Sequence, residues 1–245
     1  MRKDLMGAQW KHAGRIENSS KRGALISKLV KEITVAAKVG DPHPDNNARL
    51  RAAVEAARKS SVPRENIERA IKKGAGLLED SVQYELVTYE GFGPHQVPVV
   101  VECLTDNKNR TAADIRILFR KGMLGSIGSV SWMFNRLGVV EAMHSNRGQD
   151  LEEVAIEAGA QEVEPLDPSE VTEGQVGARF LCEPSDLDAV SKSVQQAGWN
   201  VTTSEMSYLA KNLLPFSEEQ KKEISDFLSA IDDHDDVHRI YTAMK

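Results

Sequence analysis

The residues best suited to chemistry in this sequence are cations near its start. In "RENIERAIKKG", residues 64–74, the isoleucines and the alanine recur at helical spacing, which predicts an amphipathic helix with one buried stripe. The cations of its opposite face are Arg69, Lys72 and Lys73. The two lysines also suit a helix C-terminus electrostatically, so they have a structural explanation of their own.

The distribution of charge makes a functional explanation necessary. Residues 1–76 hold 17 Lys+Arg and 8 Asp+Glu, a net charge of +9, whereas residues 77–245 hold 14 and 29, a net charge of −15; together they give −6. An excess of nine positive charges repels itself unless an anion binds. The segment 1–76 is therefore predicted to bind nucleic acid, with the acidic remainder confining the contact to one lobe.

Other cations of residues 1–76 are also predicted to contact nucleic acid. Arg51 and Arg58 are seven residues apart on another predicted helix and so share one side of it. The opening "WKHAGRIENSSKRG" has too few apolar residues to order itself, and its candidates are Trp10, Lys11, His12, Arg15, Lys21 and Arg22. Trp10 would stack on a base in a nucleic-acid arm; in a solvated tail it would pack on the first helix.

A second candidate phosphate site lies in "TDNKNRT", residues 105–111, between a predicted strand and a predicted helix. Lys108 and Arg110 stand where unpaired backbone N–H groups begin a helix, an arrangement that favours phosphate. The structural alternative is ordinary N-capping by one of three side chains: Asp106, Asn107 or Thr111. The two interpretations are compatible.

No pattern predicts catalysis, a metal site or a cofactor. The glycines of "GFGPH" and "GMLGSIGS" lack the spacing of a nucleotide-binding loop, and "DDHDDVH", residues 232–238, is typical of a solvated acidic turn. Cys103 and Cys182 lie in apolar runs and are predicted to be buried free thiols in a reducing compartment. We expect a cytoplasmic protein that is not an enzyme and binds neither a membrane nor a small-molecule substrate.

Element order predicts an α+β fold in three domains. Residues 1–76 are read as three helices that pack as a bundle, because short amphipathic helices are not stable alone. Residues 135–208 follow the order β-α-β-β-α-β of a ferredoxin-like unit. Residues 77–134 and 209–245 are incomplete separately and are expected to complete one sheet, with the ferredoxin-like unit inserted between them. "GSVSWMF", residues 128–134, is predicted to be a strand.

Several stretches together resemble one family. "KRGALISKLVKEITVAAKVGDPHPDNNARLRAAVEAARKSSVPRENIERAIKKG" is similar to the N-terminal domain of the YebC family of bacterial and organellar regulators, and "YEGFGP", "TDNKNRTAADIR", "GSVSWMF" and "DDVHRIY" resemble its later motifs in order. The resemblance implies three domains around an open groove, a cytoplasmic location and no cofactor. It departs from the family at His95 and Gln96, where a glycine pair is usual, and at Ala13 and Ser20, which dilute the charge of the opening.

The resemblance implies two functions. Members are described as probable transcriptional regulators that bind DNA, and the family also includes mitochondrial translational activators and members linked to ribosomes stalled on proline-rich chains. We therefore predict a DNA-binding transcriptional regulator, with a ribosome-associated translation factor as the alternative. Charge alone does not separate duplex DNA from ribosomal RNA, because both present phosphates. The oligomeric state stays open.

Overall fold

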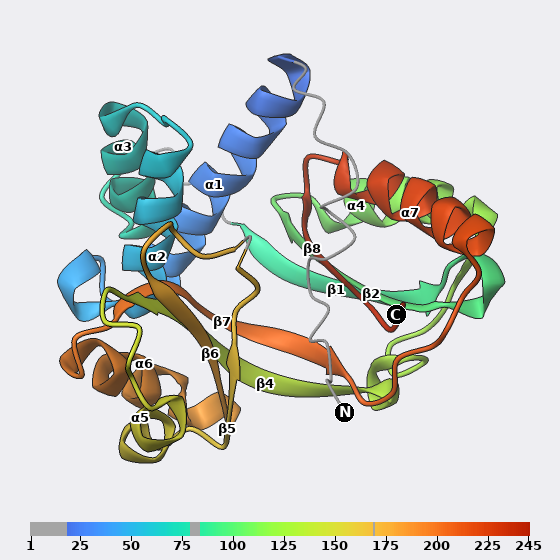
Figure 1. Cartoon of the computed structure of the whole chain (residues 1–245). Helices are drawn as coiled ribbons and strands as arrows, with labels where there is room; N and C mark the ends of the chain where they lie inside the picture. The colour runs from blue at the N-terminus through green and yellow to red at the C-terminus, as the bar shows by residue number, and fades with distance from the viewer. Residues whose placement is uncertain (1–18, 79–83, 169) are drawn as a thin grey trace. The chain divides into compact units, whose positions relative to one another are not determined.

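The computed structural model describes residues 19–78, 84–168 and 170–245, which fall into two compact units. Among the described residues, unit 1 comprises 19–31, 84–135 and 208–245, and unit 2 comprises 32–78, 136–168 and 170–207. Each unit contains a four-stranded sheet (Figure 1). The predicted fold class, helices followed by two α+β parts of which one is inserted in the other, is confirmed. The boundaries of the three predicted domains stay a prediction.

The helical part of the chain consists of α1 (Ser19–Val39), α2 (Ala48–Lys59) and α3 (Arg64–Gly74). Leu50 and Ala57 on α2 and Ile67 on α3 are buried, as their helical spacing predicts. Gly74 ends α3, and a Cβ atom there would lie 2.3 Å from the carbonyl oxygen of Thr34 on α1. Glycine is therefore needed at this position because α1 and α3 approach closely.

The ferredoxin-like unit has the predicted order of elements. Its members are β4 (Phe134–His144), α5 (Leu151–Ala158), β5 (Glu162–Pro165), β6 (Val176–Cys182), α6 (Leu187–Gln196) and β7 (Asn200–Ala210). The strands lie in the order β5-β6-β4-β7, with β6 antiparallel to both of its neighbours. Phe180 and Trp199 pack edge to face at 5.7 Å between ring centroids in the core beneath α5 and α6.

The sheet of unit 1 joins strands far apart in the sequence. Its members are β1 (Glu85–Phe92), β2 (Pro98–Thr105), β3 (Met123–Leu124) and β8 (Val237–Thr242), in the order β3-β1-β2-β8. The helices α4 (Lys108–Leu118) and α7 (Glu218–Asp232) contribute to its core. There the rings of Phe119 and Phe227 pack edge to face, with 5.4 Å between their centroids. The prediction that the first strands and the last complete one sheet is confirmed.

Two predictions about this unit need correction. Of the predicted strand at residues 128–134 only Phe134 is in a strand: after a turn, Ser131–Met133 is a single turn of 3-10 helix, and β4 begins at Phe134. The backbone N–H groups of Gly128, Val130 and Ser131 bind the side chain of Glu90 and so cannot join a strand ladder. The two-residue strand β3 was not predicted, because so short a run carries no periodicity.

Both cysteines behave as predicted. Cys103 and Cys182 are free and buried, and burial raises the pKa of the first thiol to about 12 and of the second to about 11. A thiol that keeps its proton is a weak nucleophile, so neither is suited to covalent chemistry. In the part of the chain that is described, no helix has both the length and the apolar character needed to cross a membrane.

The turn between β1 and β2 keeps a glycine-like backbone without glycine. His95 has φ 58° and Gln96 has φ 61°, both in the left-handed region. The His95 imidazole contacts the Glu223 carboxylate at 2.8 Å, which holds the turn against α7. His95 and Gln96 stand where the family that the sequence resembles usually has a glycine pair. Their backbone nevertheless has the conformation that glycine adopts most easily.

Replacing Gln96 with glycine is expected to raise the free energy of unfolding by about 0.5–1 kcal/mol. The left-handed conformation costs a residue with a side chain about 1–2 kcal/mol, and glycine avoids this cost. Part of the gain is lost because glycine gives the unfolded chain more conformational entropy. Urea unfolding of the full chain measures the change. Gln196→Gly, near the end of α6, is the control and should lower stability. Equal losses in both variants would contradict the strain at Gln96.

Candidate nucleic-acid interface

The helices α2 and α3 present five exposed cations to solvent. One of them, Arg64, pairs with Glu68 at 2.7 Å, which leaves four for an interface. These are Arg58, Lys59, Arg69 and Lys72. Among the described residues none of the four has a carboxylate within ion-pair distance. On α3 the buried side chains are Ile67 and Ala70, so the cations lie on the opposite face, as the spacing predicts.

Other cations of the same helices are engaged inside unit 2. The Arg49 guanidinium donates two hydrogen bonds to the Glu32 carboxylate, at 2.7 and 3.2 Å. Arg51 donates to the carbonyl oxygen of Asp45 at 2.7 Å and to the side chain of Gln195 on α6. Arg51 therefore ties α2 to its neighbours, and its contact with nucleic acid stays a prediction. Lys73 is only half exposed and also has an interaction partner.

Part of the predicted site falls on residues that the structure does not describe. Trp10, Lys11, His12 and Arg15 are outside the described residues. Lys21 and Arg22 belong to the first turn of α1, but their side chains are also outside the description. Their contact with nucleic acid stays a prediction.

The predicted phosphate site at "TDNKNRT" contains a network of ion pairs. Lys108 contacts Glu85 at 2.5 Å, and one Arg110 nitrogen lies 2.8 Å from Asp106 and 2.9 Å from Asp236. The Asn107 side chain caps α4 by accepting the Arg110 backbone N–H at 3.1 Å. The capping interpretation is thus confirmed, while a phosphate here would have to compete with three carboxylates.

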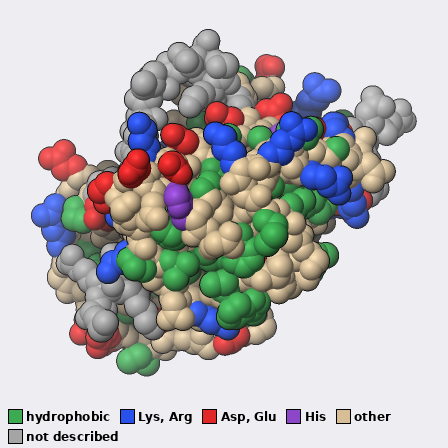
Figure 2. Space-filling view, turned by 90° about the vertical axis from the view of Figure 1, so that its right-hand side faces the viewer, with side chains coloured by type: hydrophobic (Ala, Val, Ile, Leu, Met, Phe, Trp, Pro, Cys, Tyr) green, Lys and Arg blue, Asp and Glu red, His purple; other side chains and the backbone are tan. Residues whose placement is uncertain are grey.

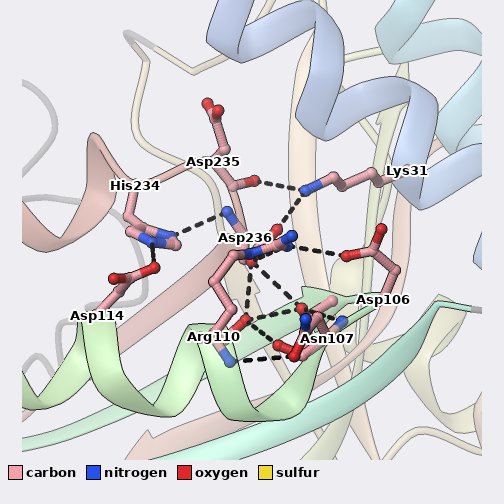
Figure 3. Close-up of polar contacts among 10 residues, drawn as sticks. Lys31, Asp106, Asn107, Arg110, Asp114, His234, Asp235 and Asp236 are labelled. Carbon is pink, nitrogen blue, oxygen red and sulfur yellow. Dashed lines mark hydrogen bonds and ion pairs between the residues drawn. The ribbon is translucent and has the colours of Figure 1, made fainter.

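Asp236 is the centre of that network (Figure 3). Its side chain is 4% exposed and accepts hydrogen bonds from Lys31 of α1 (2.7 Å), from Arg110 (2.9 Å) and from the Thr111 hydroxyl (2.8 Å). Burial alone would raise the pKa of Asp236, but these donors and the Lys31 charge lower it far below its ordinary value. The carboxylate therefore stays ionised and connects α1, α4 and the turn before β8.

A histidine orders the remainder of that turn. The Asp236 backbone N–H donates to His234 Nδ1 at 3.1 Å, so the other ring nitrogen, Nε2, carries the hydrogen and faces Asp114 at 3.2 Å. The turn "DDHDDVH" was predicted to be solvated, and this is wrong for Asp236, which the fold buries. Sequence reasoning missed the residue because its donors come from α1 and α4, about 200 and 125 positions away.

An open cavity of about 590 Å³ adjoins the network within unit 1. Besides the His234 imidazole, its lining contains two cations and five carboxylates: Lys31, Arg110, Asp106, Asp114, Asp233, Asp235 and Asp236. Carboxylates outnumber the cations, so the cavity does not favour a phosphate. Within the described ranges, no three acidic, histidine or cysteine side chains are placed to hold one metal ion.

Comparison with known proteins identifies the family. Residues 8–77 match the model of the TACO1/YebC protein N-terminal domain, and residues 84–244 match that of the TACO1/YebC second and third domain. The chain belongs to the TACO1/YebC family. The predicted resemblance is therefore confirmed over nearly its whole length.

Relatives in this family share the full length of the chain. A "Probable transcriptional regulatory protein" of Pseudomonas syringae pv. tomato is 51% identical over 241 residues, covering 98% of this chain and 99% of that protein. One from Bdellovibrio bacteriovorus is 48% identical and covers 98% and 100%. The crystal structure of a conserved hypothetical protein, Aq1575, from Aquifex aeolicus matches with a TM-score of 0.76 and 36% identity over 96% of each chain. The names given to the TACO1/YebC relatives describe regulators and no enzymatic activity.

Proposed function

We propose that this TACO1/YebC protein is a nucleic-acid-binding regulator that contacts phosphates through the exposed cations of α2 and α3. The observation that carries the proposal is that Arg58, Lys59, Arg69 and Lys72 remain exposed and without carboxylate partners among the described residues, while nearby arginines are engaged. Exposed cations gain most by displacing the counterions of a polyanion.

The acidic side chains of α3 limit how this helix can dock. Glu65 and Glu68 are exposed on its first two turns, whereas Arg69 and Lys72 lie nearer its C-terminus. A helix inserted along its length into a DNA groove would bring those carboxylates against phosphates. We therefore infer that the C-terminal ends of α2 and α3 contact the backbone, with weak dependence on base sequence.

Duplex DNA is the partner favoured by the relatives' description as transcriptional regulators. Ribosomal RNA is the alternative, and backbone contacts of this kind serve either polymer. Crosslinking in growing cells, followed by sequencing of the copurified nucleic acid, separates the two. Discrete promoter fragments support the first, and ribosomal RNA fragments support the second.

The triple variant Arg58→Glu, Arg69→Glu and Lys72→Glu is expected to bind duplex DNA about 100-fold more weakly near 0.1 M salt. The slope of log K against log salt should fall in magnitude by about 2.7, which is about 0.9 for each of the phosphates that is no longer neutralised. Fluorescence anisotropy of the full chain on a labelled duplex, in a salt series, measures both quantities. The matched control reverses Arg147, Lys222 and Lys245, which are also exposed and, among the described residues, have no carboxylate within ion-pair distance. Equal losses in the two triple variants would overturn the proposal, because net charge alone would then explain binding.

A further inference from the structure

A second cationic surface lies in the part of the chain that is otherwise acidic. Residues 77–245 have a net charge of −15, yet residues 115–140 contain Arg116, Arg120, Lys121 and Arg136 and no Asp or Glu. Arg116, Arg120 and Lys121 of unit 1 are exposed. The net negative charge from which confinement to one lobe was predicted is therefore absent from this stretch.

The loop of residues 125–133 follows these cations and is held by a buried carboxylate. Glu90 is 5% exposed, and its carboxylate accepts the backbone N–H groups of Gly128 (2.9 Å), Val130 (2.9 Å) and Ser131 (2.8 Å). The Glu90 carbonyl oxygen also accepts the N–H of Gly125 at 2.8 Å. Both oxygens of the side chain are used inside the loop, so this carboxylate does not repel an anion at the surface in the way an exposed one would.

The same end of β1 contacts both the stretch that follows the cations and the loop. Phe92 pairs with Met123 and Gly91 with Leu124, and Glu90 binds the loop itself. Three consecutive residues of β1 therefore anchor both the stretch that follows Lys121 and the loop. The surface that we call the loop platform comprises Arg120, Lys121, Met123, Ile127 and Trp132.

The loop platform exposes large apolar side chains as well as cations. Ile127 is 90% exposed, Trp132 66% and Met123 55%. On the face drawn in Figure 2, hydrophobic side chains gather in one area, with lysines and arginines along part of its edge. Trp132 is also oriented: its indole N–H donates to the Ser129 carbonyl oxygen at 3.1 Å, and Lys211 donates to the Trp132 carbonyl oxygen at 2.8 Å.

We propose that the loop platform binds single-stranded nucleic acid, with Trp132 stacking on an unpaired base while Arg120 and Lys121 contact the adjoining phosphates. An exposed aromatic ring among cations suits a single strand, whose bases have free faces, better than a duplex, whose bases are already stacked. The hydrogen bonds of the loop restrict the ring before binding, which reduces the entropy lost on association. The inference rests on the proposed nucleic-acid role but assigns a different surface and a different form of the polymer.

Substitutions at Trp132 test stacking directly. Anisotropy of labelled oligoadenylates of about 12 nucleotides, as RNA and as DNA, should show Trp132→Leu binding about 10-fold more weakly and Trp132→Tyr within about threefold of the wild type. In a Trp10→Phe background, unlabelled oligonucleotide should quench part of the tryptophan emission. Adding Trp132→Tyr should abolish this quenching, because the remaining tryptophan, Trp199, is 2% exposed. Preference between the RNA and DNA probes identifies which single strand is the better ligand.

The cations are tested by charge reversal with a matched control. Arg120→Glu with Lys121→Glu should reduce the slope of log K against log salt on either single strand by about 1.4, or 0.7 for each phosphate that is no longer neutralised. The control variant Arg147→Glu with Lys222→Glu has the same net charge as the Arg120→Glu, Lys121→Glu variant. It should leave most of the slope unchanged. Full retention of single-strand binding by Trp132→Leu would overturn the proposal. In that event, loss of duplex binding in the α2–α3 triple variant would still support the function proposed above.

Discussion

Asp236→Asn is expected to lower the free energy of unfolding by about 3–5 kcal/mol, the usual cost of removing one partner from a buried ion pair. The asparagine occupies the same volume, but its amide nitrogen would face either Lys31, if it replaces Oδ1, or Arg110 and Thr111, if it replaces Oδ2. Lys31 would also lose its nearest counterion while its side chain is only 14% exposed. Urea unfolding at neutral pH measures the loss.

The pH dependence of this effect gives a second measurement. Because the pKa of Asp236 is lowered from its ordinary value of 3.8, the unfolded chain takes up the proton first as the pH falls. The contribution of the carboxylate is therefore complete above about pH 4–5 and decreases progressively as the pH falls below that. The stability difference between wild type and Asp236→Asn should shrink in the same range.

Asp233→Asn is the control for Asp236. Asp233 borders the same cavity but is exposed and is expected to change stability by less than about 0.5 kcal/mol. A similar loss in both variants would mean that the acidity of the turn matters and that the hydrogen bonds of Asp236 do not. In that case the ion-pair network would not be what joins α1 to α4.

Glu90→Gln is expected to destabilise the chain by about 2–4 kcal/mol, because three backbone N–H groups would share one amide oxygen and at least one buried donor would lose its partner. Burial by itself would raise the pKa of Glu90, but the N–H groups of Gly128, Val130 and Ser131 bring it below the ordinary value. The carboxylate form is thus the one that the loop binds. Thermal or urea unfolding and hydrogen exchange of these three amides measure the effect, and their protection should fall more than that of the β1–β2 ladder.

Glu85→Gln provides the matched comparison on the same strand. Glu85 pairs with Lys108 at 2.5 Å, but both side chains are 56% exposed, so the loss should stay below about 1 kcal/mol. If Glu90→Gln cost no more than Glu85→Gln, the loop would not depend on the buried carboxylate. The orientation of Trp132 would then need another explanation.

Local patterns predicted most of the fold. Helical spacing in residues 64–74 correctly placed Ile67 in the core and Arg69 in solvent, and the order of elements predicted the ferredoxin-like unit. These predictions succeed because helix and strand periods decide which side chains share a face, whatever lies elsewhere in the chain. The strand predicted at residues 128–134 failed because a side chain 38 to 41 positions away takes its backbone N–H groups.

The sequence by itself determined where charge is concentrated, which helix faces carry it and which residues can form a core, because all three follow from residue type and local period. Only the tertiary structure decided which cations are available. It paired Arg110 with Asp236 across 126 positions, engaged Arg51 with Gln195 across 144, and left Arg69 and Trp132 exposed. An ion pair or a buried hydrogen bond forms only where the fold brings segments that are distant in the sequence close together in space. Local residue spacing does not predict which distant segments become neighbours.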